Sequence, residues 1–205
     1  MILELRFDQL RPRQVPSYTE RWRAALPSRE ALSPLKGLWR TEVGDIDQIV
    51  HLWAYDDLAQ RELVEREAAA LPDWNALQCR TQVQRQKNLL VAPAAFSPPL
   101  TERSLGTVYE LRIYQYDAGT IPNVIERWHE KVEARQRLSP LVLCGHTVSG
   151  TQHQWVHMWA YQDALERTRI RAESLRSGVW PPAATDGLVH QRNMLLVPLP
   201  PSPLS

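Results

Sequence analysis

The sequence predicts an α+β fold: two tandem ferredoxin-like (βαββαβ) halves packed sheet-to-sheet as an intramolecular pseudo-two-fold α+β barrel. Three observations support this fold class. The chain of 205 residues repeats itself at a shift of 106 positions. Each copy shows the same order of strand-like and helix-like hydrophobic periodicities. One strand of each copy has two dissimilar faces, so a sheet face in each copy needs a partner.

The repeat is clearest in the stretch VHLWAYDDLAQR (50–61), which returns as VHMWAYQDALER (156–167). Further matches at the same shift are Glu4-Leu5-Arg6 with Glu110-Leu111-Arg112, Glu20-Arg21-Trp22 with Glu126-Arg127-Trp128, and Trp74 with Trp180. Near the end the shift becomes 105, so that Asn88 corresponds to Asn193. Similarity over this length indicates a duplication, and a duplication defines the architecture.

The first part of each repeat reads as a strand followed by a helix. Residues 3–8 alternate between apolar and polar side chains, as strands do, and residues 109–114 repeat the pattern less strictly. Residues 15–26 place an apolar stripe along one side of a helix, and residues 121–132 do the same. A proline at the start of each of these helices suits the first turn, where no backbone donor is needed.

The second part of each repeat reads as two strands, a helix and a closing strand. In the first repeat, strands at 37–43 and 48–55 flank the turn Gly44-Asp45. A helix at 57–70 begins at an aspartate that can cap it, and a short strand at 89–91 closes the repeat. This order is the ferredoxin-like one, with an antiparallel sheet and both helices on one face.

The domain boundaries follow from the repeat and from its prolines. We predict a first repeat at residues 1–91, a linker at 92–106, a second repeat at 107–198 and a Pro-rich tail at 199–205. Prolines and small residues in the linker favour an irregular connection. The tail is expected to be extended and disordered.

Alternation sorts the strand side chains into two faces. We predict that the small apolar set packs under the helices: Val50, Leu52 and Ala54 in the first copy, and Val156, Met158 and Ala160 in the second. The opposite, bare face then carries Glu, Arg, His, Trp and Tyr in both copies. This mixture suits a half-lined cavity between the two sheets, with aromatic walls and a few polar groups.

Composition argues against several function classes. The chain carries 24 basic and 23 acidic residues, a net charge of +1, so we expect neither a nucleic-acid partner nor a membrane surface. The two cysteines, Cys79 and Cys144, take non-equivalent places in the repeat, which argues against a disulfide framework. Neither a long apolar run nor a secretory signal is visible, and we therefore predict a cytoplasmic protein.

Four motifs together resemble the NIPSNAP family: the opening ELR, the helix with ERW, the strand with H-x-W-x-Y followed by Asp, and the closing N-x-L-L-x-P. The resemblance covers residues 1–100 and 107–198, and H-x-W-x-Y is its most specific part. It implies the ferredoxin-like halves of the dimeric α+β barrel group. That group includes cofactor-free monooxygenases, polyketide cyclases, haem-degrading enzymes and chlorite dismutases, so the resemblance implies no single activity.

The candidate site residues lie on the predicted bare face. Candidates for catalysis are His51, Arg6 and Glu4 in the first repeat and His157, Arg112 and Glu110 in the second. Candidates for substrate binding are Trp53, Tyr55, Trp159, Tyr161 and Tyr114. An imidazole can shuttle a proton near neutral pH, and a guanidinium can hold developing negative charge. The same groups can also form a purely structural network of hydrogen bonds and ion pairs.

These residues lead us to predict a cofactor-independent enzyme that uses acid/base chemistry on a small aromatic or polyketide-like substrate in the barrel cavity. One alternative is a non-catalytic small-molecule-binding or protein-interaction scaffold, and a weaker one is a haem-binding barrel. No zinc-ligand spacing and no nucleotide-binding motif occur, so the leading hypothesis needs neither a metal nor a cofactor. The expected partner is a small molecule, and assembly into a homo-oligomer remains open.

Overall fold

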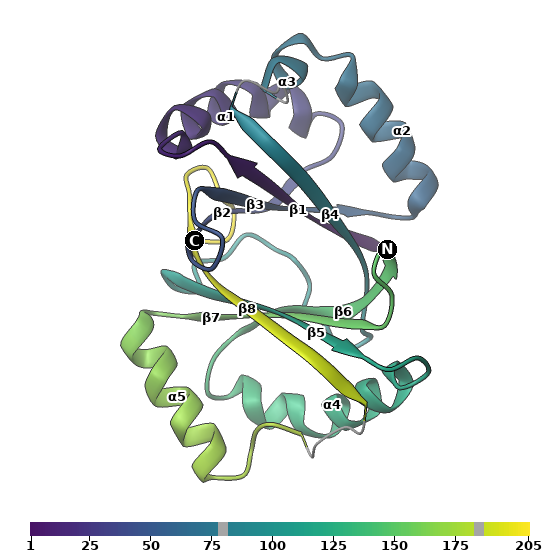
Figure 1. The fold of residues 1–205 in the computed structure, drawn as a ribbon, viewed down its shortest axis with the longest axis vertical. Helices are drawn as coiled ribbons and strands as arrows, with labels where there is room; N and C mark the ends of the chain where they lie inside the picture. The colour runs from purple at the N-terminus through teal and green to yellow at the C-terminus, as the bar shows by residue number, and fades with distance from the viewer. Residues whose placement is uncertain (78–81, 183–186) are drawn as a thin grey trace. The chain divides into compact units, whose positions relative to one another are not determined.

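The computed structural model describes residues 1–77, 82–182 and 187–205, which form two compact units (Figure 1). The first unit contains residues 1–90, 101–104 and 196–205, and the second contains residues 91–100 and 105–195. Within the described residues, no helix is both long and apolar enough to cross a membrane.

The first unit is a four-stranded sheet covered on one face by helices (Figure 1). Its strands are hydrogen-bonded in the order β4-β1-β3-β2, and β3 runs antiparallel to both β1 and β2. The elements are β1 (Ile2–Leu10), α1 (Val15–Glu30), β2 (Leu35–Val43), β3 (Gln48–Tyr55), α2 (Leu58–Ala69), α3 (Pro72–Leu77) and β4 (Val83–Pro93), of which residues 91–93 belong to the second unit.

The second unit repeats this topology with the strand order β8-β5-β7-β6, and β7 runs antiparallel to both β5 and β6. Its elements are β5 (Val108–Tyr116), α4 (Ile121–Gln136), β6 (Leu141–Ser149), β7 (Gln154–Tyr161), α5 (Ala164–Arg176) and β8 (Leu188–Pro198), of which residues 196–198 belong to the first unit. The predicted fold class, α+β with two tandem ferredoxin-like repeats, is confirmed.

Most predicted elements are present, with different lengths. The strand 48–55 is found as predicted, and Asp57 caps α2 by accepting a hydrogen bond from the Gln60 backbone N–H at 2.8 Å. The closing strand β4 is much longer than the predicted 89–91. Its first half carries five consecutive exposed side chains, 84–88, so it shows no alternation for sequence reasoning to detect.

The short helix α3 was not predicted, and it marks a difference between the repeats. The corresponding described residues of the second unit, 178–182, form no helix. Gly178 adopts a left-handed φ of 67°, and Trp180 is followed by two prolines, which cannot donate the backbone hydrogen bonds of a helix. As a result, the second unit has an irregular segment where the first has a helical cover.

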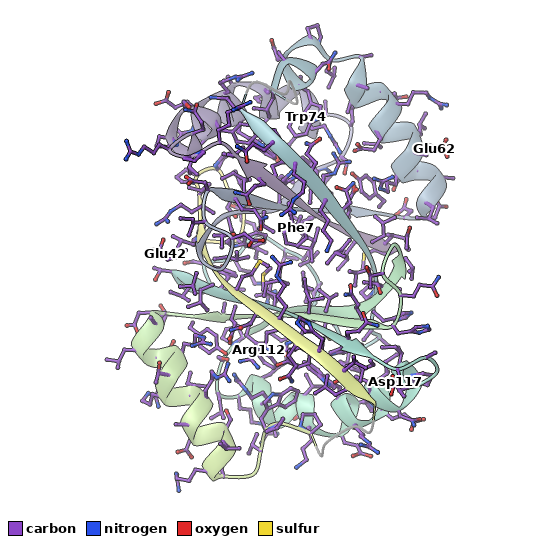
Figure 2. The ribbon with its side chains drawn as sticks, viewed as in Figure 1. Phe7, Glu42, Glu62, Trp74, Arg112 and Asp117 are labelled. Carbon is purple, nitrogen blue, oxygen red and sulfur yellow. The ribbon has the colours of Figure 1, made fainter. Side chains whose placement is uncertain are left out.

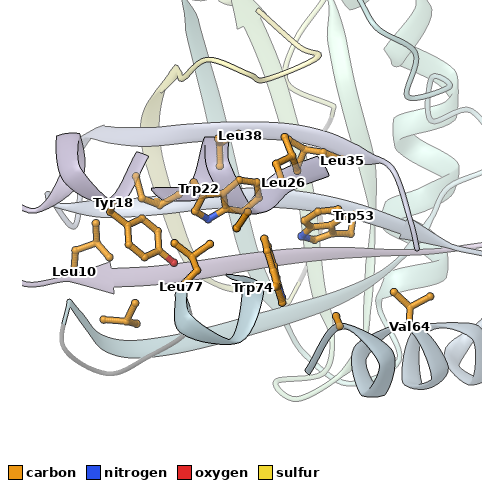
Figure 3. Close-up of a cluster of buried hydrophobic side chains, with 14 of the residues drawn as sticks. Leu10, Tyr18, Trp22, Leu26, Leu35, Leu38, Trp53, Val64, Trp74 and Leu77 are labelled. Carbon is orange, nitrogen blue, oxygen red and sulfur yellow. The ribbon is translucent and has the colours of Figure 1, made fainter. Parts of the chain in front are cut away.

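The prediction of which sheet face meets the helices is wrong. In the first unit, Trp53 packs against Trp22 of α1 and Trp74 of α3, with ring centroids 6.1 Å and 5.9 Å away (Figure 3). His51 lies on the same side, 5.2 Å from the Trp22 ring. The second unit repeats this with Trp128, whose ring lies 4.6 Å from His157. The H-x-W-x-Y motif therefore faces the helices of its own unit.

The inverted assignment has a physical reason. The apolar side chains Leu5, Val50 and Leu52 lie on the sheet face opposite the helices and are fully buried, so both faces are inaccessible to solvent. The polar side chains under the helices are buried at little cost in stability, because helix residues such as Tyr18 and Glu65 form hydrogen bonds and ion pairs with them. Figure 2 shows how densely side chains fill the space between each sheet and its helices, with Trp74 in the first unit and Arg112 in the second.

The Pro-rich tail is ordered, contrary to the prediction of disorder. The backbone N–H of Leu199 donates to the Leu38 carbonyl at 3.0 Å, and the Leu38 N–H donates to the Ser202 hydroxyl at 2.9 Å. Leu204 is fully buried. The tail is therefore a packed part of the first unit.

Candidate functional site

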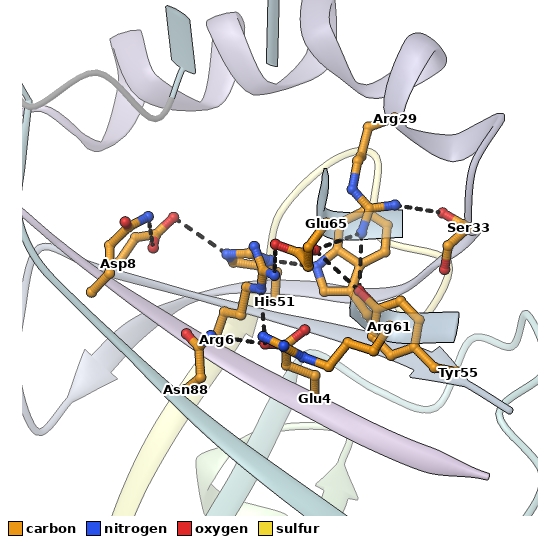
Figure 4. Close-up of polar contacts among 12 residues, drawn as sticks. Glu4, Arg6, Asp8, Arg29, Ser33, His51, Tyr55, Arg61, Glu65 and Asn88 are labelled. Carbon is orange, nitrogen blue, oxygen red and sulfur yellow. Dashed lines mark hydrogen bonds and ion pairs between the residues drawn. The ribbon is translucent and has the colours of Figure 1, made fainter. Parts of the chain in front are cut away.

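In the first unit, His51 belongs to a complete hydrogen-bond network. Its Nδ1 accepts from Trp53 Nε1 at 2.7 Å, and its Nε2 lies 3.3 Å from Asp8 Oδ2 (Figure 4). Asp8 also accepts from the Tyr18 hydroxyl at 2.8 Å and from Gln86 Nε2 at 3.0 Å. Burial by itself raises the pKa of Asp8, but His51 and these donors hold it below its usual value. Both ring nitrogens of His51 therefore have partners.

A second network in the first unit surrounds the carboxylate of Glu65 on α2. Arg6 forms a short ion pair with Glu65 Oε2, and Arg29 Nη2 lies 3.3 Å from Glu65 Oε1 (Figure 4). Arg29 is fully buried, with its guanidinium 4.1 Å from the centre of the Trp53 ring and donating to the Tyr55 hydroxyl at 3.0 Å. Burial works against the charge of Glu65, but the arginines lower its pKa below its usual value.

Glu4 completes the charge balance of the first unit. Its Oε1 accepts from Arg61 at 2.5 Å and from the Asn88 amide at 2.8 Å, and it lies 3.2 Å from Arg6 Nε. The two networks thus contain three carboxylates, those of Glu4, Asp8 and Glu65, and three guanidinium groups, those of Arg6, Arg29 and Arg61. The polar interior of this unit is close to neutral.

The second unit keeps the histidine but loses its acceptor. His157 Nδ1 accepts from Trp159 Nε1 at 3.0 Å, as in the first unit, but Tyr114 stands at the position of Asp8. Within the described part of the chain, the buried Nε2 of His157 has no hydrogen-bond partner. Because Nδ1 accepts, the neutral ring carries its proton on Nε2, and this N–H is an unused donor. Burial, together with Arg112 and Arg135, holds the pKa of His157 well below 6.5.

The second unit also keeps the arginines but loses their carboxylate. Arg135 corresponds to Arg29, with its guanidinium 4.3 Å from the centre of the Trp159 ring and donating to the Tyr161 hydroxyl at 3.1 Å. The position of Glu65 is taken by Arg171, which reverses the charge. Arg135 forms no ion pair among the described residues, and burial together with Arg112 lowers its pKa. Its charge is therefore uncompensated at close range.

Among the described residues, Glu110 is the carboxylate that pairs with the corresponding arginines of the second unit. Its Oε1 pairs with Arg112 at 2.9 Å and Arg171 at 3.0 Å, and forms a short ion pair with Arg167. The Asn193 amide donates to the same oxygen at 3.2 Å. At the positions compared above, one carboxylate faces four guanidinium groups, counting Arg135. The second unit therefore concentrates positive charge where the first is balanced.

A cavity of about 520 Å³ lies beside these groups in the second unit. Its polar lining includes Arg112, Arg135, His157, Arg171, Ser174 and Gln191, and its aromatic lining includes Tyr114, Trp128, Trp159, Tyr161 and Trp180. Leu175, Pro181 and Pro182 contribute further apolar surface, the prolines from the segment that replaces α3. Aromatic walls with a few convergent polar groups are typical of a small-molecule site.

The first unit has a smaller counterpart of about 440 Å³, lined by Arg6, Glu65, Ala69, Trp74, Asn75, Gln86 and Asn88. Several of these positions correspond to residues that line the larger cavity. The two cavities are thus the same feature of the fold, and the first has the Glu65 carboxylate in it. Among the residues that the structure describes, no acidic side chain lines the second.

The structure brings the predicted site residues together in two separate sets. Glu4, Arg6, His51, Trp53 and Tyr55 meet in the first unit, and Glu110, Arg112, Tyr114, His157, Trp159 and Tyr161 meet in the second. Sequence reasoning missed the helix residues that complete each set, chiefly Arg29 and Glu65 with their counterparts Arg135 and Arg171. The aligned repeats did contain a signal, the charge reversal from Glu65 to Arg171.

Two other sequence features carry no chemistry here. Cys144 is a free, fully buried thiol whose pKa burial raises to about 12, so it is not available as a thiolate nucleophile. Cys79 lies outside the described residues. Among the residues that the structure describes, no cluster of three or more His, Cys, Asp or Glu side chains could hold a metal ion.

The lowered pKa of His157 predicts a pH-dependent stability. Below pH 6.5 the unfolded chain binds a proton on this histidine while the folded chain does not. The free energy of unfolding therefore decreases as the pH is lowered. Between pH 7.5 and 5.5 this one group should lower the free energy of unfolding by roughly 1 kcal/mol. Denaturant titrations of wild type and His157→Gln at both pH values measure it. Equal pH dependence of the two proteins would contradict the prediction, because they share all other titrating groups.

Comparison with known proteins gives a consistent result for both repeats. The NIPSNAP family model matches residues 3–98 and again residues 109–203. Human "Protein NipSnap homolog 2" is 26% identical over 219 residues, which cover 99% of this chain and 74% of the human protein. "Protein NipSnap" of Drosophila melanogaster is 26% identical over 193 residues, which cover 88% of this chain and 69% of the fly protein.

Solved structures with a similar fold include proteins with very different sequences. A protein from Fusobacterium nucleatum subsp. nucleatum, described as a candidate monooxygenase, superposes with a TM-score of 0.69 at 11% identity, covering 97% of this chain and 92% of its own. A NIPSNAP domain protein from Burkholderia xenovorans is 27% identical and covers 48% of this chain and 100% of its own, with a TM-score of 0.45. The first likeness extends over nearly the whole chain and shows the fold alone.

Proposed function

The chain belongs to the NIPSNAP family, and from this premise we propose that its second repeat is a small-molecule-binding module. The ligand occupies the cavity between the sheet of the second unit and its helices α4 and α5. The first repeat serves as a scaffold in which His51, Arg6 and Arg29 already have partners among its own side chains. The proposal favours small-molecule binding, the first of the alternatives drawn from the sequence.

One observation carries this proposal, namely the unpartnered N–H of His157 in a cavity with aromatic walls. A buried donor without an acceptor costs roughly 1–3 kcal/mol, and a ligand oxygen that accepts from it removes this cost. In the first unit the same histidine is satisfied by Asp8 at 3.3 Å. The replacement of Asp8 by Tyr114 leaves the donor of His157 free for a ligand oxygen, and the aromatic rings can hold the ligand body.

Catalysis on the bound molecule is a second candidate function, and the same histidine favours it. A neutral imidazole that donates from Nε2 can stabilise an oxygen that gains negative charge during a reaction. A general base fits less well, because the Nδ1 lone pair is already bonded to Trp159 at 3.0 Å. The likeness to a candidate monooxygenase adds no support for an activity, since only the fold is shared.

A fragment screen of the full chain by ligand-observed NMR tests the binding proposal. We expect small aromatic compounds to bind wild type and to lose most of their binding to Ser174→Phe, which places a ring in the cavity of the second unit. The matched control is Ala69→Phe, because Ala69 lines the cavity of the first unit. Thermal melting confirms that each variant is folded.

Leu175→Trp, at an exposed rim position, replaces Ser174→Phe if that variant does not fold. The binding proposal fails if no fragment binds wild type. It also fails if the fragments bind equally well to the filled variant, because binding would then lie elsewhere on the molecule.

A further inference from the structure

The cavity of the first unit contains a built-in carboxylate that indicates what the second cavity binds. The Glu65 carboxylate enters from α2 and is held by Arg6 and Arg29. Both arginines are almost completely buried, whereas Glu65 is 27% exposed at the edge of the cavity. A carboxylate group in this position is thus compatible with the geometry of the fold.

The second unit retains the arginines that hold this carboxylate in the first unit, but it lacks the carboxylate itself. Arg112 and Arg135 correspond to Arg6 and Arg29, and both line the cavity. Arg171 replaces Glu65 and also lines the cavity, with its side chain 43% exposed. The exchange removes one negative charge and adds one positive charge at the same place. The vacated position is therefore surrounded by guanidinium groups on several sides.

On these grounds we propose that the second unit selects an organic carboxylate, whose charged group takes the place that Glu65 occupies in the first unit. This inference rests on the proposed binding function and specifies its ligand. Arg112 and Arg135 hold the carboxylate, and Arg171 closes over it from α5. An apolar body then lies against Trp128, Trp159 and Trp180.

Charge and hydrogen bonding both favour such a ligand over a neutral one. A buried guanidinium without a counter-ion is costly, and an entering anion removes that cost. Glu110 does so only in part for Arg135, because its Oε1 is already shared by Arg112, Arg167 and Arg171. The Nε2 proton of His157 remains for a second oxygen of the ligand, in the role that Asp8 has for His51. A ligand with an aromatic or apolar body, a carboxylate and one further acceptor can pack against the tryptophans, pair with the arginines and accept from His157.

Isothermal titration calorimetry with 2-naphthoate and its neutral amide, 2-naphthamide, tests this inference on the full chain. Charge-assisted hydrogen bonds should make the carboxylate bind about 10- to 100-fold more tightly. Arg171→Glu restores the charge pattern of the first unit and should remove this preference. Arg135→Gln should also weaken 2-naphthoate by about 10-fold or more.

The control variant is Arg137→Gln, which removes an exposed arginine at the C-cap of α4 that pairs only with Glu133 among the described residues. It should leave both affinities unchanged. Equal binding of 2-naphthoate and 2-naphthamide to wild type overturns the carboxylate assignment while the binding proposal stands. Tighter binding of 2-naphthyl phosphate than of 2-naphthoate also overturns it. If Arg135→Gln does not fold, Arg171→Glu at the cavity edge still decides, because an unchanged preference in that variant contradicts the inference.

Discussion

Replacing Glu110 with alanine is expected to lower the free energy of unfolding of the second unit by about 3–5 kcal/mol, the usual cost of leaving buried charges unpaired. Glu110 is fully buried and pairs with three arginines through Oε1. Without it, no carboxylate remains in this network, and four guanidinium groups repel one another in a region of low dielectric. Denaturant titration followed by circular dichroism measures the loss.

The control for this prediction is Glu133→Ala, which removes an exposed carboxylate paired with Arg137 at 2.7 Å. Surface pairs of this kind contribute about 0–1 kcal/mol, so little change is expected. A loss of less than about 1 kcal/mol for Glu110→Ala would show that solvent compensates the arginines more than their burial indicates. A bound carboxylate should restore part of the stability of this variant, since it replaces the missing negative charge.

The second prediction concerns Glu65→Ala, which should convert the first cavity into an anion site. The variant leaves Arg6 and Arg29 without their shared carboxylate and is expected to lose about 2–4 kcal/mol, less than Glu110→Ala because Glu65 is partly exposed. Adding acetate should raise the melting temperature of the variant. Once the acetate concentration exceeds the dissociation constant, the increase should be proportional to the logarithm of the acetate concentration. Wild type should respond much less in the first unit, where Glu65 already fills the position.

Two comparisons sharpen the acetate experiment. Glu62→Ala removes an exposed carboxylate from the same helix and should neither destabilise the first unit nor create a response to acetate. Sodium chloride at equal ionic strength separates specific binding from screening. If acetate and chloride act alike on Glu65→Ala, then Arg6 and Arg29 do not form a carboxylate site. That result would also count against a carboxylate site formed by Arg112 and Arg135.

The two repeats together show how a duplicated unit can acquire a binding site with few substitutions. Three exchanges separate the filled network from the open one: Asp8 to Tyr114, Tyr18 to Val124 and Glu65 to Arg171. The first two remove the acceptor of the histidine and the hydroxyl that supported it. The third removes the internal carboxylate. Each loss leaves an unsatisfied group on the remaining framework, and a ligand can satisfy it.

The sequence by itself determined the duplication, the order of strands and helices in each repeat, and the strand residues that meet at the site. These features rest on local patterns, since identity at a fixed shift and hydrophobic periodicity are both readable along one chain. The motif His51, Trp53 and Tyr55 was correctly placed on one strand face with Glu4 and Arg6. The histidine does have a carboxylate partner in the first unit, Asp8, which was not among the predicted site residues.

Only the tertiary structure decided which face of the sheet the helices cover, and with it the location of the site. Alternation separates two faces but does not label them, and both faces of β3 are buried. The polar face is covered because Tyr18, Arg29 and Glu65 reach it from the helices, and these contacts join residues 10 to 59 positions apart. Periodicity treats Arg29 and Glu65 as surface residues, since it registers hydrophobicity and not partners. The charge reversal at Arg171 became meaningful once the structure placed Glu65 between two buried arginines.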